Sequence, residues 1–172
     1  LSAAQQRFTE AIDAYKECVY LAERANRSDL SVRAKINMSR VCIDQTRLAD
    51  AKFVLDGAFK KLSGLRDTHN KVYDFIAISR LMNRIYLESP DTDLLNRAYN
   101  ALQSAESIAG KLTNRRASSY ALGYLGALYE QGKRYEDALL LTNRAILAAQ
   151  QANATESLYR WYWQQGRISR KR

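Results

Sequence analysis

The sequence predicts an all-α protein built from repeated helical hairpins. Ala and Leu, two strong helix formers, account for 45 of the 172 residues. Seven Gly and one Pro are too few to separate the many short strands of a β-sandwich. Hydrophobic residues make up 47% of the chain, which is enough for a buried core in one domain of this length. A repeated pattern of small residues then indicates where the hairpins lie.

The repeated pattern places an alanine at the same point of four segments, three residues after a large side chain and seven before a small one. The four alanines are Ala11, Ala51, Ala98 and Ala138, separated by 40, 47 and 40 residues. Near-constant separation is typical of repeat proteins, in which each unit buries its apolar face against its neighbours. We therefore expect one repeat domain over 1–172, with units of about 40 residues. The expected units are approximately 1–26, 31–62, 69–110, 115–152 and 155–172.

Periodicity and helix-ending residues divide these units into helices. Eight helices are expected, over 3–26, 31–45, 47–62, 69–88, 92–110, 115–131, 134–152 and 155–169. Gly64 and Gly110 are expected to close helices, and Pro90 lengthens the loop that accounts for the interval of 47. Segments 29–31 and 153–155 supply candidate N-caps. The first and last helices lack hairpin partners, and the last is too apolar for a capping helix, so we expect a fragment of a longer protein.

The clearest unit runs from residue 125 to residue 138. Its diagnostic residues are a Leu-Gly pair, two tyrosines, a turn glycine and an alanine: Leu125, Gly126, Tyr129, Tyr135, Gly132 and Ala138. This unit resembles the tetratricopeptide repeat (TPR), and the resemblance implies a right-handed α-solenoid of antiparallel hairpins whose first helices line a concave face. Gly126 and Ala138 are expected to let two helices approach closely. Gly132, one place before the family's usual turn glycine, is expected to end the first helix through a conformation that glycine permits.

The segment 156–168 has an unusual composition, with Trp161 and Trp163 among tyrosines, arginines and glutamines. It looks like a segment that recurs in bacterial TPR proteins whose C-terminal part is a CHAT domain, a caspase-like peptidase fold. The resemblance implies a parent protein with a peptidase domain outside this chain and no catalytic residue within it. Because residues two apart on a helix point to different faces, at most one of the two tryptophans is expected to be fully buried.

The sequence offers little material for catalysis or for holding a cofactor. It has one histidine, His69, expected near a helix start in a capping or solvated role, and it lacks HExxH, Gly-rich phosphate-loop and Gly-x-Ser-x-Gly motifs. Cys18 and Cys42 match no metal-ligand spacing, and both are expected to be small buried residues. We therefore expect no enzyme activity, no cofactor and no metal site. The sequence shows no membrane-spanning stretch and no signal-peptide pattern, and it does not identify a compartment.

An excess of basic residues, 27 against 18 acidic and a net charge of +9, favours an acidic partner. The leading hypothesis is a protein–protein interaction scaffold or sensor region that binds a peptide or protein segment in its concave groove. The alternative is an RNA-binding α-hairpin solenoid, although nucleic acid is disfavoured because no polar reader pair recurs at a fixed position. Carrying the Gly126 register along the chain gives these inward-facing positions: Arg33, Arg40, Arg80, Arg84, Tyr120, Tyr124, Arg160, Trp163 and Arg167. Arginines on both sides of an aromatic depression suit an extended acidic segment with one apolar anchor.

Overall fold

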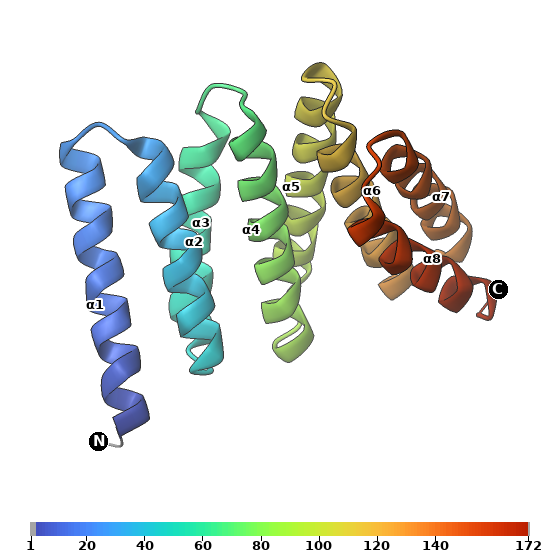
Figure 1. The fold of residues 1–172 in the computed structure, drawn as a ribbon. Coiled ribbons are helices and arrows are strands. Elements are labelled where there is room, and N and C mark those ends of the chain that lie inside the picture. Colours follow the sequence, from blue (N-terminus) through green and yellow to red (C-terminus); the bar gives the residue numbers. More distant parts are fainter. Residues whose placement is uncertain (1–2, 172) are drawn as a thin grey trace. The chain divides into compact units, whose positions relative to one another are not determined.

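The computed structural model describes residues 3–171, and these form eight α-helices and no strand (Figure 1). The helices are α1 (Ala3–Arg24), α2 (Ser28–Asp44), α3 (Leu48–Ser63), α4 (His69–Glu88), α5 (Thr92–Lys111), α6 (Arg115–Gln131), α7 (Tyr135–Gln151) and α8 (Thr155–Ser169). The all-α prediction is confirmed, and each helix end lies within three residues of its expected position. Within the described range, no helix has the length and apolar character to cross a membrane.

The chain divides into two compact units. The N-terminal unit comprises Leu1–Arg66 with Ala77–Ala98, and the C-terminal unit comprises Asp67–Ile76 with Tyr99–Arg172. Helices α4 and α5 therefore contribute residues to both units. The expected division into five repeat units stays a prediction.

In the N-terminal unit, α1 packs on α2 and α2 packs on α3, each pair antiparallel (Figure 1). The Glu23 carboxylate joins these three helices, because it accepts hydrogen bonds from Ser31 Oγ at 3.0 Å, Lys35 Nζ at 3.2 Å and Lys61 Nζ at 3.0 Å. Hydrogen bonds from Lys61, then from Ser31 and Lys35, lower the pKa of Glu23 to about 2. The carboxylate therefore stays charged wherever the three donors stay in place.

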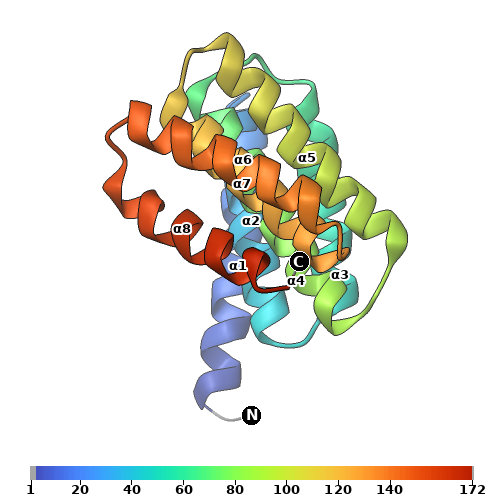
Figure 2. The same ribbon diagram turned by 90° about the vertical axis from the view of Figure 1, so that its right-hand side faces the viewer.

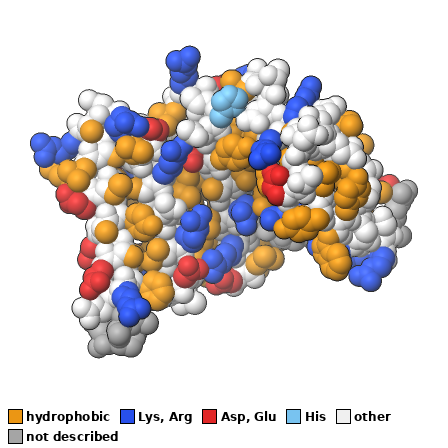
Figure 3. Space-filling model, viewed as in Figure 1, with side chains coloured by type: hydrophobic (Ala, Val, Ile, Leu, Met, Phe, Trp, Pro, Cys, Tyr) orange, Lys and Arg blue, Asp and Glu red, His pale blue; other side chains and the backbone are white. Residues whose placement is uncertain are grey.

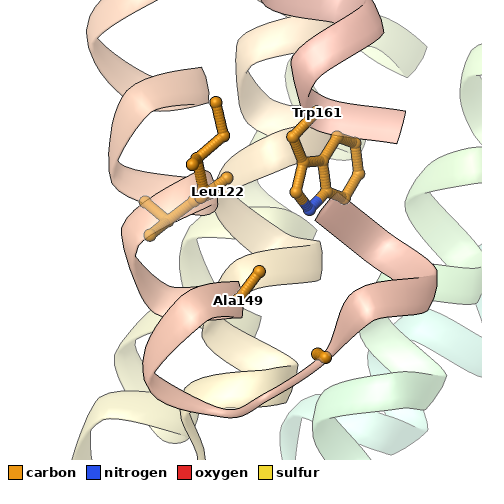
Figure 4. Packing of buried hydrophobic residues seen from close by; sticks show 6 residues of the cluster. Leu122, Ala149 and Trp161 are labelled. Atoms are coloured by element: carbon orange, nitrogen blue, oxygen red, sulfur yellow. The ribbon is translucent and has the colours of Figure 1, made fainter. Parts of the chain in front are cut away.

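In the C-terminal unit, α6 and α7 form a hairpin, and α7 and α8 lie side by side (Figure 2). The expected close approach of the hairpin is confirmed: Ala138 is fully buried, and a Cβ atom added at Gly126 would lie 3.1 Å from the Ala138 carbonyl oxygen. A core of small and large apolar residues fills the space between the three helices (Figure 4). Its buried members are Leu122, Ala145, Ile146, Ala149, Ala154 and Trp161.

Five turns between helices share one backbone conformation that the sequence patterns did not predict. Each contains a non-glycine residue with φ between 51° and 59°: Asn26, Thr46, Thr113, Lys133 and Asn153. After α6, Lys133 N donates to Glu130 O at 3.0 Å and Arg134 N donates to Tyr129 O at 2.9 Å, which is the Schellman pattern. Gly132 has a φ of −76°. The expectation that Gly132 provides the unusual conformation is therefore wrong, because the left-handed residue is Lys133.

The expected N-cap at 29–31 is also wrong, whereas the cap position of α8 lies within 153–155 as expected but has no side-chain cap. Helix α2 begins at Ser28, so Asp29 lies in its first turn, where it accepts hydrogen bonds from Arg27 Nε and Nη2, each at 3.0 Å. Asn153 forms the turn before α8, and Ala154 occupies the cap position. A side-chain cap occurs instead at α6, where Asn114 Oδ1 accepts a hydrogen bond from Ala117 N at 3.1 Å.

The two cysteines differ in their surroundings. Cys42 is buried as expected, and this burial raises the pKa of its thiol. Cys18 is exposed, so the expectation that both cysteines are buried is wrong for this residue. Both thiols are free.

Candidate functional site

The candidate site lies in the C-terminal unit, where aromatic side chains of α6 and α8 meet. Tyr120 and Tyr124 lie one turn apart on α6, with their rings stacked at a centroid distance of 6.4 Å. Trp161 of α8 meets both rings edge-on, at 6.0 and 5.5 Å. The indole can approach α6 because Gly123 has no side chain: a Cβ atom added there would lie 2.5 Å from two of the indole carbons. A glycine on α6 therefore provides the space that Trp161 fills.

Hydrogen bonds fix α8 in this position. Trp161 Nε1 donates to Ser119 Oγ at 2.9 Å. Gln164 Nε2 donates to the Gly123 carbonyl oxygen and to Thr142 Oγ1, both at 2.9 Å. The side chains of Trp161 and Gln164 are both buried, so these bonds hold α8 against both helices of the α6–α7 hairpin without access for water.

Arg160 completes what we call the aromatic–arginine cluster, defined as Tyr120, Tyr124, Arg160 and Trp161. Arg160 Nη1 donates to Tyr124 Oη at 2.8 Å, and its guanidinium carbon lies 6.0 Å from the Trp161 ring centroid. Burial, and then the nearby Glu156 carboxylate, raise the pKa of Tyr120, so this phenol stays neutral at physiological pH. The cluster thus presents two half-buried phenol rings beside one guanidinium.

Arg167, another predicted site residue, is part of the contact between α6 and α8. Its Nε and Nη2 atoms donate to Glu130 Oε1 and Oε2 at 2.8 and 2.6 Å, and Lys171 Nζ donates to the same carboxylate at 3.1 Å. The Arg167 hydrogen bonds are the main cause that lowers the pKa of the buried Glu130 carboxyl. Sequence reasoning missed Glu130. The sequence does contain a signal for it, because an acidic residue stands near the end of α6 and basic residues stand near the end of α8, the first helix of the next unit.

Trp163 does not join the cluster. It is 73% exposed, whereas Trp161 is 1% exposed, which confirms that at most one tryptophan is fully buried. Trp163 shares the outer side of α8 with Tyr159, which is 67% exposed. Trp163 follows Arg160 by three residues and precedes Arg167 by four, but it is exposed whereas both arginines are half-buried.

The N-terminal unit carries the remaining predicted arginines, on α2 and α4. Arg84 Nη1 forms an ion pair with Asp44 Oδ1 at 2.8 Å, and Arg40 Nη1 donates to Asn37 Oδ1 at 3.1 Å. Arg80 is exposed and Arg33 is half-buried. On the face seen in Figure 3, Lys and Arg side chains lie among hydrophobic ones over α2 and α4. The structure thus brings the predicted arginines into two groups, one in each unit.

Further polar groups surround a separate pocket of the C-terminal unit. Its volume is about 320 Å³, and Tyr99 and Tyr129 join across it through their hydroxyls at 2.8 Å. The lining residues come from α5, α6 and α7: Tyr99, Gln103, Glu106, Leu122, Leu125, Tyr129, Leu141 and Arg144.

His69 starts α4 as expected, and its Nδ1 lies 2.9 Å from Asn114 Nδ2. Across residues 3–171, no group of His, Cys, Asp and Glu is placed to hold a metal ion.

Comparison with known proteins supports the fold alone. No protein-family model matches the sequence, and no curated protein matches it. Among solved structures, the chain is similar to BtubC (BKLC) from P. vanneervenii, with a TM-score of 0.71 and 13% sequence identity. The similarity covers 99% of this chain and 72% of BtubC. At this identity it shows a shared helical, repeat-like fold.

Proposed function

We propose that this chain is a TPR-like interaction module that binds an acidic peptide or protein segment, acting as a scaffold or sensor region. The observation that carries the proposal is the aromatic–arginine cluster. Its rings are held rigidly by Trp161, and rigid aromatic and Arg side chains contribute most to binding at protein interfaces. The proposal includes the right-handed superhelix that the TPR resemblance implies and the repeat of about 40 residues that the alanine spacing predicts.

The charges favour an acidic ligand because two of the predicted arginines interact with neutral groups. Arg160 donates to a phenol oxygen and Arg40 to an amide oxygen, so their hydrogen bonds leave a full positive charge for a partner carboxylate. Arg84 and Arg167, by contrast, already pair with carboxylates of this chain. We therefore assign binding in the C-terminal unit to Arg160 and the tyrosines, and a positioning role to Arg167.

A labelled short peptide of Asp and Glu with one central Phe tests this proposal in a fluorescence-anisotropy titration. The peptide should bind the 172-residue chain, with an affinity that falls as salt rises. Arg160→Gln should slow association, and Tyr124→Ala should speed dissociation. The matched controls are Lys60→Gln and Phe53→Ala, both at exposed positions of α3, and neither should change binding.

Two results would overturn the proposal. One is equal binding by the parent chain, Arg160→Gln and Tyr124→Ala. The other is preference for a single-stranded oligouridine over the peptide at equal salt, which would favour the RNA-binding alternative.

We also propose that the parent protein carries a CHAT-type peptidase domain that this module regulates. The support is the resemblance of segment 156–168 to the TPR segments of such proteins. The test is biochemical: the isolated module, added in trans, should change the activity of the parent's peptidase domain. If neither the unsubstituted module nor its Arg160→Gln variant changes the peptidase activity, the regulatory role is contradicted.

A further inference from the structure

The outer side of α8 is an exposed face that α7 reaches at one edge, where Gln150 Nε2 donates to Tyr162 Oη at 3.0 Å. It is formed by Tyr159, Tyr162, Trp163 and Gly166, and the three aromatic side chains are 67%, 47% and 73% exposed. A Cβ atom added at Gly166 would meet nothing within 4 Å. We call these four residues the α8 face.

The register of the hairpins shows what such a face contacts elsewhere in the molecule. Gly166 follows Gly126 by 40 residues. A Cβ atom at Gly126 would lie 2.7 Å from Thr142 Oγ1 and 3.1 Å from the Ala138 carbonyl oxygen, both on α7. In the N-terminal unit, Ser79 holds the same position, and its Oγ donates to the Ala98 carbonyl oxygen at 2.7 Å. A small residue at this position is therefore the contact point of a first helix with the second helix of its hairpin.

Helix α1 carries the reciprocal face. Ala11 corresponds to Ala138, and Cys18 corresponds to Ala58, Ala105 and Ala145, which are fully buried in α3, α5 and α7. Cys18 is exposed, and so is Leu21, at 52%. The opposite side of α1 is occupied, because α1 packs on α2 and Ile12 and Ala22 are buried. Helix α1 thus has the face of a second helix, formed by Ala11, Ala14, Cys18 and Leu21, without a first helix against it in the described chain.

We propose that the α8 face of one molecule binds α1 of a second copy and completes a hairpin between the two. Side-chain size supports the match. The α8 face contains large aromatic rings, and α1 has the small residue Ala14 at the position where α7 has the larger Leu141. Charge supports it too, because α1 contains four acidic and three basic residues, whereas residues 155–171 contain one acidic and four basic residues. The contact is head-to-tail, so a dimer keeps one free face of each kind and can add further copies. This inference does not rest on the acidic-segment site.

Two substitutions block the two ends separately. Gly166→Glu fills the close-approach point of the α8 face, and Cys18→Glu places a charge at the centre of the α1 face. Neither disturbs the single copy, because Gly166 has open space around it and Cys18 is exposed. The matched controls are Gly57→Glu, at another exposed glycine of a helix interior with open space, and Cys18→Ala, which installs the alanine of the other hairpins.

Light scattering coupled to size exclusion, run under reducing conditions over a range of concentrations, tests the proposal. The parent chain, Gly57→Glu and Cys18→Ala should show a mass that rises with concentration. Gly166→Glu alone and Cys18→Glu alone should each be monomeric. An equimolar mixture of these two should give a dimer and nothing larger, because it offers one open α8 face and one open α1 face.

Three results would overturn the proposal. A monomeric parent chain at every concentration would mean that this face is not an interface between copies. Dimers of Cys18→Glu alone would indicate contact between two α8 faces. A parent chain that assembles, together with an equimolar mixture of blocked variants that stays monomeric, would exclude α1 as the occupant.

Discussion

Replacing Gly123 by Ala should destabilise the protein, although alanine is the better helix former. In a helix interior, Gly→Ala normally gains about 1 kcal/mol. At Gly123 the new Cβ atom would lie 2.5 Å from the Trp161 ring, which is 1% exposed and hydrogen-bonded to Ser119. Overpacking of this kind costs about 1–3 kcal/mol, and we take the upper part of the range because the indole has no room to move. The expected net loss in the free energy of unfolding is about 1–2 kcal/mol.

The sign of this effect should reverse when the ring is absent. Trp161→Ala should itself cost about 3–5 kcal/mol, because it removes a large buried side chain. In that background Gly123→Ala should gain about 1 kcal/mol, which gives a coupling energy of about 2–3 kcal/mol between the two sites. Urea unfolding followed by circular dichroism measures all four variants, since the far-ultraviolet helix signal does not depend on Trp161. Gly57→Ala, in open space on α3, should gain about 1 kcal/mol in both backgrounds. A Gly123→Ala effect of the same sign and size with and without Trp161 would refute the packing argument.

Three further outcomes follow from contacts elsewhere. Glu130→Gln should cost about 1–3 kcal/mol at neutral pH. The folded-state pKa of Glu130 lies below its ordinary value of 4.5, so the ionised carboxylate stabilises the fold above that pH. This stabilisation is lost as the pH falls through the folded-state pKa. The free energies of unfolding of the parent chain and the variant should therefore converge in urea titrations at acid pH. Thr46→Gly should raise the free energy of unfolding by about 1 kcal/mol, because Thr46 has a φ of 55°, whereas Thr92→Gly at the start of α5 should not stabilise. Deleting 155–172 uncovers Ile146, which is 7% exposed, and should lower the melting temperature; an unchanged value would show that α8 does not pack as part of the unit.

The helices could be predicted because their signals are local and repeated. Four alanines at near-constant separation predict where the second helix of each hairpin lies. Three of them, Ala51, Ala98 and Ala138, are fully buried. The close approach at Gly126 follows from the same spacing, because only a small side chain fits where two helices cross. Burial of one tryptophan and exposure of the other follow from the helical period alone.

The turns and the site's polar contacts could not be predicted in the same way. Lys133 and Thr46 adopt left-handed conformations because the Schellman hydrogen bonds of the backbone require them, and neither side chain favours that conformation. The pairing of Glu130 with Arg167 depends on two helices that are separated by the whole of α7. The exposure of Cys18 depends on which helices flank α1, and a pattern within α1 does not contain that information.

Hydrogen exchange of the 172-residue chain with and without the acidic peptide tests the central claim, that the aromatic–arginine cluster is the binding surface. Binding should protect backbone amides of α6 around Tyr124 and of α8 around Arg160, and this protection should disappear in Arg160→Gln. Protection confined to α3 and α7, with α6 and α8 exchanging as in the free chain, would contradict the claim.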